Sequence, residues 1–303
     1  MRQDMCAPHP EYLQLQGAGR IVDGTFRSLA EHHLYGTPKL MTNRPPRFSA
    51  LRQGPIVFED HFDGPTLDRS KWLPAYLPHW TTLEAAQARY ELRNGSLRLL
   101  IEDDQPAWLP DLEGELKVSN LQTGHFSGPL GSPHGQHRSR AGLVVRTELL
   151  QTQLFVPTYC RLEMRARVRL NPWNLAGLWL IGFEDEPERS GEITVFEAFG
   201  HNVAPNTALI GRGIKKINDP NLTDELDEGE LTIAVEDWHD YAMDWSASGV
   251  EFYVDDQLVT RTDQSPDYPM QLMLNLYDLP SEHDRSNATD PWFDVDFIRA
   301  FAA

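Results

Sequence analysis

The sequence predicts an all-β fold, a sandwich of two stacked antiparallel sheets, and three observations carry this prediction. Apolar and polar residues alternate over Tyr159–Leu170, many short strand-like runs are separated by turns, and helical periodicity is nearly absent. The chain has 303 residues, which is enough for one large domain with a sizeable core. We expect this domain to occupy residues 51–303.

The same patterns identify the elements in chain order. Leu83–Tyr90 is the one stretch for which we expect a short helix. The dipeptide Asn94-Gly95 predicts a tight hairpin turn, and Asn171-Pro172 predicts the end of a strand. Strands or strand pairs are expected over Arg89–Ile101, Tyr159–Leu170, Tyr241–Thr262 and Phe293–Phe301. Antiparallel strands joined in this way favour a sandwich.

Residues 1–50 differ from the rest of the chain. They are rich in His, Pro, Arg and Gly and show little periodicity, which predicts an irregular N-terminal extension. The alternative is that part of this stretch packs back on the domain through Leu13, Leu15, Ile21 and Phe26. No basic segment followed by an apolar one stands at residues 1–16, so we expect no secretion signal there, and the compartment stays open.

The charge balance restricts the partners. Lys and Arg number 27 against 45 Asp and Glu, so the net charge is -18. This surplus argues against binding a phosphate backbone or an anionic membrane, and no apolar run approaches the ~20 residues that span a bilayer. A neutral partner would not be repelled. The sequence does not fix the oligomeric state, for which a monomer is our expectation.

A pair of glutamates carries the predicted chemistry. In a regular strand over Gly191–Glu197, Glu192 and Thr194 share one face and Glu197 falls on the other. A bulge near Val195-Phe196 would bring Glu197 back to the side of Glu192. Two carboxylates about 5–5.5 Å apart serve a retaining glycosidase as nucleophile and general acid/base. Taken alone, the spacing favours two solvated surface residues.

The surrounding sequence resembles glycoside hydrolase family 16, a family of concanavalin A-like jelly rolls that includes laminarinases, lichenases and agarases. The family motif is Glu-x-Asp-x-x-Glu, which Glu192–Glu197 follows except at its middle position, where Thr194 stands. The order and spacing of the other segments carry the resemblance from about Val57 to Phe301. These segments are Phe58–Gly64, Tyr159–Arg165, Gly177–Trp179, Trp238–Trp245, Leu272–Asn275 and Val295–Arg299.

The resemblance implies a retaining endo-glycosidase, or transglycosylase, that acts on a β-linked polysaccharide such as a β-glucan or galactan in a concave cleft. It implies that Glu192 is the nucleophile and Glu197 the acid/base, with no cofactor required. Thr194 can donate a hydrogen bond to Glu192 but carries no charge. We therefore expect an acid-shifted pH optimum and low turnover. The alternative function is a non-catalytic, lectin-like carbohydrate-binding protein, which the loss of the aspartate favours.

The resemblance also implies residues that bind the substrate. Glu163 and Arg165 match sugar-contacting positions, and Asn275 and Tyr277 match an Asn and an aromatic that line the cleft. For Trp179, a position in the core and a role as a platform for a sugar ring are about equally supported. The family often carries a histidine after the motif, which Gly211–Ile214 lacks. We assign no metal ligand, although Asp60, Asp294 and Asp296 are candidates for a structural Ca²⁺ site.

Overall fold

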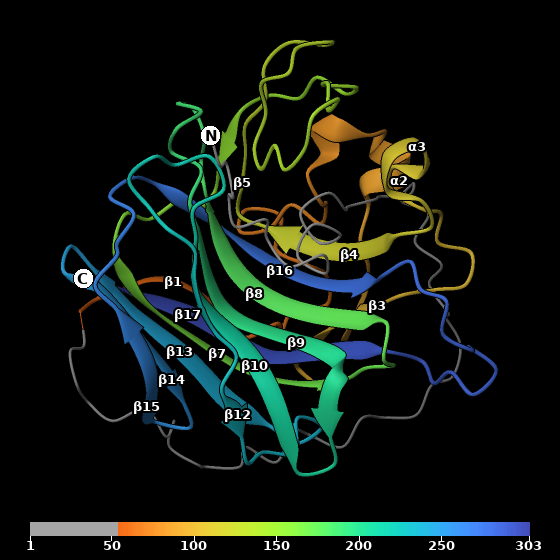
Figure 1. The fold of residues 1–303 in the computed structure, drawn as a ribbon, viewed down its shortest axis with the longest axis vertical. Helices are drawn as coiled ribbons and strands as arrows, with labels where there is room; N and C mark the ends of the chain where they lie inside the picture. The colour runs from red at the N-terminus through yellow and green to blue at the C-terminus, as the bar shows by residue number, and fades with distance from the viewer. Residues whose placement is uncertain (1–53) are drawn as a thin grey trace, which may run out of the picture.

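A computed structural model describes residues 54–303 as two antiparallel sheets stacked face to face (Figure 1). The predicted two-sheet sandwich is therefore confirmed. The expected extension over residues 1–50 lies outside the described residues.

One sheet has eight strands. They are β1 (Ile56–Asp60), β2 (Arg89–Arg93), β3 (Ser96–Leu100), β7 (Cys160–Arg169), β13 (His239–Ser246), β14 (Gly249–Val254), β15 (Gln257–Thr262) and β17 (Trp292–Ala302). The order is β15-β14-β13-β7-β17-β3-β2, and β1 pairs with β17. Asn94 and Gly95 both adopt positive φ, 52° and 65°, in the turn between β2 and β3, as the predicted hairpin requires.

The other sheet has seven strands and carries the candidate site. They are β4 (Lys117–Gln122), β8 (Asn174–Gly182), β9 (Glu192–Ala204), β10 (Thr207–Lys215), β11 (Glu225–Asp227), β12 (Glu230–Leu231) and β16 (Met270–Asp278). The order is β11-β10-β9-β8-β16-β4, and β12 pairs with β10. These strands curve across the molecule in Figure 1 in front of the eight-stranded sheet.

The main core fills the space between the two sheets. The apolar residues of β7 point inward, and Leu162, Met164 and Val168 are completely buried against residues of β9 such as Ile193 and Phe196. Burial of one face of β7 is the outcome that its alternating sequence predicts. Because the inner faces fill the core, the polar residues that alternate with them occupy the two outer faces of the sandwich.

A second apolar cluster covers part of the outer face of the seven-stranded sheet. It joins Trp179 and Tyr277 to Tyr76, Trp80 and Trp108, which come from the loops before β4. The short elements in or near these loops are η1 (Pro78–Trp80), α2 (Leu83–Ala86), α3 (Pro110–Glu113), β5 (Gly124–His125) and β6 (Thr152–Gln153).

The helix predicted over Leu83–Tyr90 is shorter than expected. It ends at Ala86 because β2 begins at Arg89, whose backbone pairs with Leu100. None of the helices in residues 54–303 has the length and apolar character needed to cross a bilayer.

Candidate active site

The predicted bulge in β9 is present, and it determines which residues share a face. Thr194 lies opposite Trp179 of β8 and Phe196 opposite Leu178, so Val195 is the extra residue. Val195 and Phe196 both turn into the core. Glu192, on one side of the bulge, and Glu197, on the other, consequently face outward together.

Lys215, the last residue of β10, joins the two glutamates. It lies directly opposite Glu192 in the strand register. Its Nζ is 2.8 Å from Glu192 Oε1 and 3.1 Å from Glu197 Oε1. All three side chains are nearly buried, with exposed fractions of 7%, 4% and 9% for Lys215, Glu192 and Glu197. The two carboxylates therefore meet at one ammonium group.

The backbone of β10 leaves room for this arrangement. Gly211 lies opposite Glu197, and a Cβ atom at Gly211 would come within 3.2 Å of Glu197 Oε2 and 3.3 Å of its Cβ. A glycine at this position lets the Glu197 side chain lie flat against the neighbouring strand.

Thr194 and a chain of polar side chains surround the pair. Thr194 Oγ1 donates a 2.8 Å hydrogen bond to Glu192 Oε1, as expected for a residue that replaces the motif aspartate. Asn275 Oδ1 accepts a bond of 3.0 Å from Trp179 Nε1, and Asn275 Nδ2 donates one of 2.8 Å to the Tyr277 hydroxyl. The structure thus brings Trp179, Asn275 and Tyr277 to the predicted site.

Burial and the neighbouring charges set the protonation states. Burial raises the pKa of Glu197, Lys215 opposes this increase, and Glu192 adds to it. Burial lowers the pKa of His137 to about 4, so its ring is neutral near pH 7. A raised pKa suits Glu197 to hold a proton. The burial of Glu197 therefore opposes the acid shift in pH optimum that we expect from Thr194. That shift stays a prediction.

The cavity beside the pair is small. It has a volume of about 20 Å³ and is lined by Glu192, Glu197 and Lys215 together with Trp179 and His137. The His137 ring meets Trp179 edge to face with 5.0 Å between the ring centroids. The Glu184 carboxylate accepts a hydrogen bond from the His137 backbone N–H and so fixes the loop over the pair.

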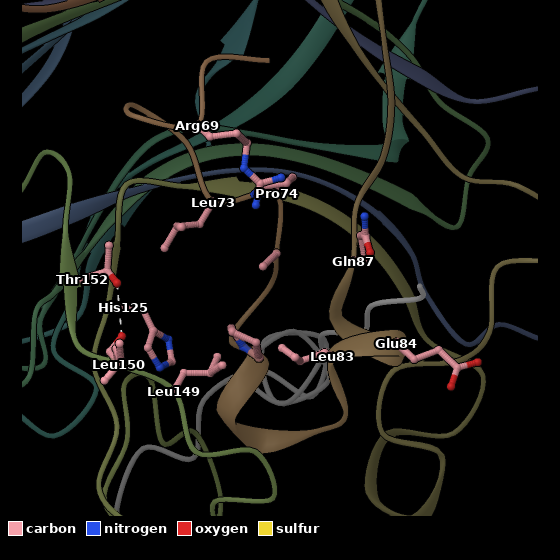
Figure 2. A pocket seen from close by; sticks show the side chains of 12 residues that line it. Arg69, Leu73, Pro74, Leu83, Glu84, Gln87, His125, Leu149, Leu150 and Thr152 are labelled. Atoms are coloured by element: carbon pink, nitrogen blue, oxygen red, sulfur yellow. Dashed lines mark hydrogen bonds between the residues drawn. The ribbon is translucent and has the colours of Figure 1, made fainter. Parts of the chain in front are cut away.

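Two larger cavities lie outside this site. One of about 740 Å³ is lined by residues of the same loop, among them His134 and Arg138, and by Glu184. The other, of about 560 Å³, is mainly apolar: Leu73, Pro74, Leu83 and Leu150 line it, as Figure 2 shows. The second cavity contains no pair of carboxylates, so its size does not make it the catalytic centre.

The assignment of Glu163 and Arg165 to the cleft is wrong. Both residues belong to β7 of the eight-stranded sheet, and their side chains point away from the core on the outer face of that sheet. Glu163 pairs with Arg161 and Arg299 at 2.6 Å and 2.7 Å. Arg165 faces Asp240 and Asp296. The sandwich core separates them from the glutamate pair.

The acidic residues considered for calcium are also engaged separately. Asp60 accepts hydrogen bonds from the Phe62 backbone and the Trp72 indole, and Asp294 pairs with Arg98. Within residues 54–303, no three acidic, histidine or cysteine side chains gather as metal ligands would. Asp296 faces Arg165, so the three aspartates form no shared site.

Sequence reasoning missed Lys215 and His137. Lys215 ends a largely apolar strand, and a lysine that interrupts such a run is a signal for a buried ion pair. Its partner could not be read from the sequence, because the partner depends on the register of β10 against β9. His137 lies in a loop with no periodic pattern.

Comparisons with known proteins show which family and which known folds this chain is similar to. Residues 149–293 match the family model described as glycosyl hydrolases family 16. A GlcNAcα1-4Gal-releasing endo-β-galactosidase from Clostridium perfringens is 28% identical with a TM-score of 0.69, and the alignment covers 81% of this chain and 62% of that chain. This chain therefore spans less than two thirds of that protein.

Two laminarinases share the fold at lower identity. That from Thermotoga petrophila RKU-1 is 17% identical with a TM-score of 0.55, over 82% of this chain and 98% of the other. That from Flavobacterium sp. UMI-01 is 17% identical with a TM-score of 0.56, over 81% and 99%. A search of curated proteins found no match.

Residues 149–293, just under half of the chain, are therefore similar to glycosyl hydrolase family 16. The predicted resemblance to this family and the predicted jelly-roll fold are thereby confirmed. The similar proteins are glycosidases, the class of enzyme that the sequence predicts for this chain.

Proposed function

We propose that this protein is a retaining endo-β-glycosidase in which Glu192 is the nucleophile and Glu197 the general acid/base. The observation that carries the proposal is the meeting of the two carboxylates at Lys215 on one face of β9. Carboxylates that contact the same nitrogen lie close together, as a double-displacement mechanism requires, whereas an inverting pair is separated by about 6.5–9.5 Å to admit water.

The first step forms a bond between the anomeric carbon and a Glu192 oxygen. The bond from that carbon to the leaving oxygen breaks, and the proton of Glu197 passes to the leaving oxygen. In the second step Glu197 takes a proton from water, whose oxygen displaces Glu192 from the anomeric carbon. Trp179 offers an aromatic face, and Asn275 and Tyr277 offer hydrogen-bonding groups for the sugar.

For the substrate we propose a galactose-containing β-linked glycan. The support is the 28% identity to an endo-β-galactosidase against 17% to the two laminarinases. The net charge of -18 is consistent with a neutral glycan and gives no attraction to nucleic acid or anionic membranes. We further propose that the protein acts as a monomer, which light scattering would test.

A panel of polymers tests the function. The protein is incubated with a glycan carrying GlcNAcα1-4Gal ends, agarose, carrageenan, laminarin and lichenan, and new reducing ends are measured. We expect cleavage of a galactose-containing member, with the β-anomer of the product appearing first in proton NMR spectra. Initial release of the α-anomer would exclude retention, and binding without cleavage of any member would favour a lectin-like protein.

Entry of a sugar requires a change at His137. A cavity of about 20 Å³ has room for about one water molecule, which needs roughly 10–15 Å³, and is far too small for a sugar ring. A pyranose ring can reach Glu192 and Glu197 only when the loop that carries His137 moves away from Trp179. The described arrangement is therefore a closed form of the site.

A further inference from the structure

Lys215 has no counterpart in the motif that the sequence resembles, yet it contacts both glutamates. Its ammonium group is 2.8 Å from Glu192 Oε1 and 3.1 Å from Glu197 Oε1, and the side chain is 7% exposed. A buried charge is tolerated when opposite charges and hydrogen bonds compensate it. The compensation here comes from two groups whose charges change during the proposed reaction.

We propose that Lys215 is a positioning residue that keeps the buried site electrically neutral in both halves of the reaction, by pairing with Glu192 before glycosyl transfer and with Glu197 after it. This inference rests on the proposed function, because it concerns the steps of a double displacement.

The charge count differs between the two halves only in where the negative charge lies. Before the first step Glu192 is a carboxylate and Glu197 is a carboxylic acid, so Lys215 balances Glu192. After that step Glu192 is a neutral ester and the proton of Glu197 has left with the leaving oxygen. Lys215 now balances Glu197. Hydrolysis of the ester returns the carboxylate to Glu192 and a proton from water to Glu197, and the first pairing is restored.

Among the described groups around the pair, Lys215 is the one whose charge can balance the two carboxylates. Of the described side chains that line the cavity, only Lys215 carries a positive charge at neutral pH, because burial keeps His137 neutral. Burial also raises the pKa of Tyr277 and that of Tyr76, so both hydroxyls are uncharged. Glu228 adds a further negative charge that acts on Glu197.

The hydrogen bonds also distinguish the oxygens of each carboxylate. Glu192 Oε1 receives both Lys215 and Thr194 Oγ1, which leaves Oε2 as the oxygen for attack on the anomeric carbon. Glu197 Oε1 receives Lys215, whereas Glu197 Oε2 is buried without a hydrogen-bond partner among the described residues. We assign the transferable proton to Glu197 Oε2. Lys215 therefore orients both groups while it shifts between them.

An NMR titration tests the pairing without any substrate. The carboxyl carbon of Glu197 is followed in ¹³C-labelled protein and assigned by its loss in Glu197→Gln. Four proteins are compared: the wild type, Lys215→Met, Glu192→Gln and the double variant. Glu192→Gln carries a neutral side chain, as the glycosyl ester does, and so represents the second half of the reaction.

We expect removal of Lys215 to raise the pH at which Glu197 titrates, because the ammonium group favours the carboxylate. The increase should be larger in the Glu192→Gln background, where Lys215 is no longer shared. Equal shifts in the two backgrounds, or no shift in either, would overturn the inference. If Lys215→Met does not fold, Lys215→Gln replaces it, since glutamine keeps a donor without the charge.

Kinetics provide the second readout. We expect Lys215→Met to lower kcat about 100-fold, the lower end for loss of one preorganised donor. The alkaline limb of the pH profile of kcat/KM should move to higher pH, and Lys215→Arg should restore it. A lower kcat with an unmoved limb would make Lys215 merely structural. A wild-type protein that titrates as expected but cleaves no glycan overturns the proposed function, whereas cleavage without the difference between backgrounds overturns the role of Lys215 alone.

Discussion

The two outer faces of the sandwich carry buried charge clusters of opposite composition. On the eight-stranded sheet one carboxylate, Glu163, lies between two guanidinium groups, Arg161 and Arg299. On the seven-stranded sheet one ammonium group, Lys215, lies between two carboxylates. A carboxylate with two cations carries no surplus of negative charge. Two carboxylates with one cation have one negative charge too many, and the surplus is relieved when one of them holds a proton.

This difference fits a structural role for the first cluster and the proposed catalytic role for the second. Each Glu163 oxygen has its own arginine, so neither oxygen is left to react. In the other cluster Glu197 Oε2 is buried and has no hydrogen-bond partner among residues 54–303. A buried oxygen of this kind carries a cost unless a proton or a ligand meets it. The balance of charges therefore distinguishes the clusters better than their burial, which is similar.

The largest expected effect comes from Glu192→Gln, which removes the proposed nucleophile. Glutamine has nearly the same shape and retains an oxygen for Thr194 and Lys215, so folding should be preserved. We expect release of reducing ends to fall about 10⁴-fold or more, as for the loss of other nucleophiles, with glycan binding largely retained. Reducing-end assays and a pull-down on the same polymer measure both. A variant with normal turnover would remove the proposed mechanism.

The same change in the other cluster should act on stability instead. Glu163→Gln leaves Arg161 and Arg299 without their shared carboxylate, although Arg161 keeps Asp244 at 2.7 Å. We expect the free energy of unfolding to fall by about 2–3 kcal/mol, somewhat less than for a fully buried pair. Urea unfolding measures this loss. Turnover per folded molecule should equal that of the wild type, and a large decrease would place Glu163 in the catalytic machinery after all.

The two clusters also show which features of the fold and the site can be predicted from the sequence. The strands and the alternation in β7 follow from local patterns. The bulge in β9 and the shared face of Glu192 and Glu197 do not, because the local period alone puts Glu197 on the opposite face, and they rest on the resemblance to the family motif. The pattern in β7 says that Glu163 and Arg165 share a face, but not on which side of the molecule that face lies. The resemblance implied that they lie in the cleft, but the stacking of the sheets places them on the opposite outer face of the sandwich.

The contacts that the sequence does not predict depend on long-range geometry. Lys215 contacts the glutamates because of the register between β9 and β10, and the sequence pattern of β10 does not predict these partners. His137 reaches Trp179 from a loop of irregular sequence, held by a hydrogen bond to Glu184, which is 47 residues away in the chain. Contacts of this kind depend on how the loops fold over the sheet.

An intermediate effect is expected from His137→Gly, which removes the ring over the proposed catalytic pair. His137 has a φ of 52°, where glycine fits without strain, so the loop should keep its path. If the closed form limits access, KM should fall about 10-fold, equivalent to about 1.4 kcal/mol removed from opening. Steady-state kinetics measure KM, and His134→Gly in the same loop is the control because His134 is exposed. A rise in KM would make His137 a sugar contact rather than an obstruction.

The smallest effect is expected from Glu184→Gln and depends on pH. Burial raises the pKa of Glu184 well above its usual 4.5, and the His137 N–H opposes this only in part. Between its pKa in the unfolded chain and its raised pKa in the fold, Glu184 is protonated only when folded. Its stabilising contribution is therefore complete below the unfolded value and declines as the pH rises towards the folded value.

Glutamine cannot ionise, so Glu184→Gln should lack this decline. We expect the variant to gain about 1 kcal/mol on the wild type between pH 5 and pH 8, within the limit of about 1.4 kcal/mol per pH unit for one proton. Urea unfolding at the two pH values measures the difference, and Glu186→Gln is the control because Glu186 is 62% exposed in its pair with Arg189. The protection of the backbone amides of residues 133–141 against hydrogen exchange, relative to an unstructured chain, should fall as the pH rises in the wild type and fall less in the variant. If stability and amide protection depend on pH identically in both proteins, Glu184 does not control the loop that covers the proposed catalytic pair.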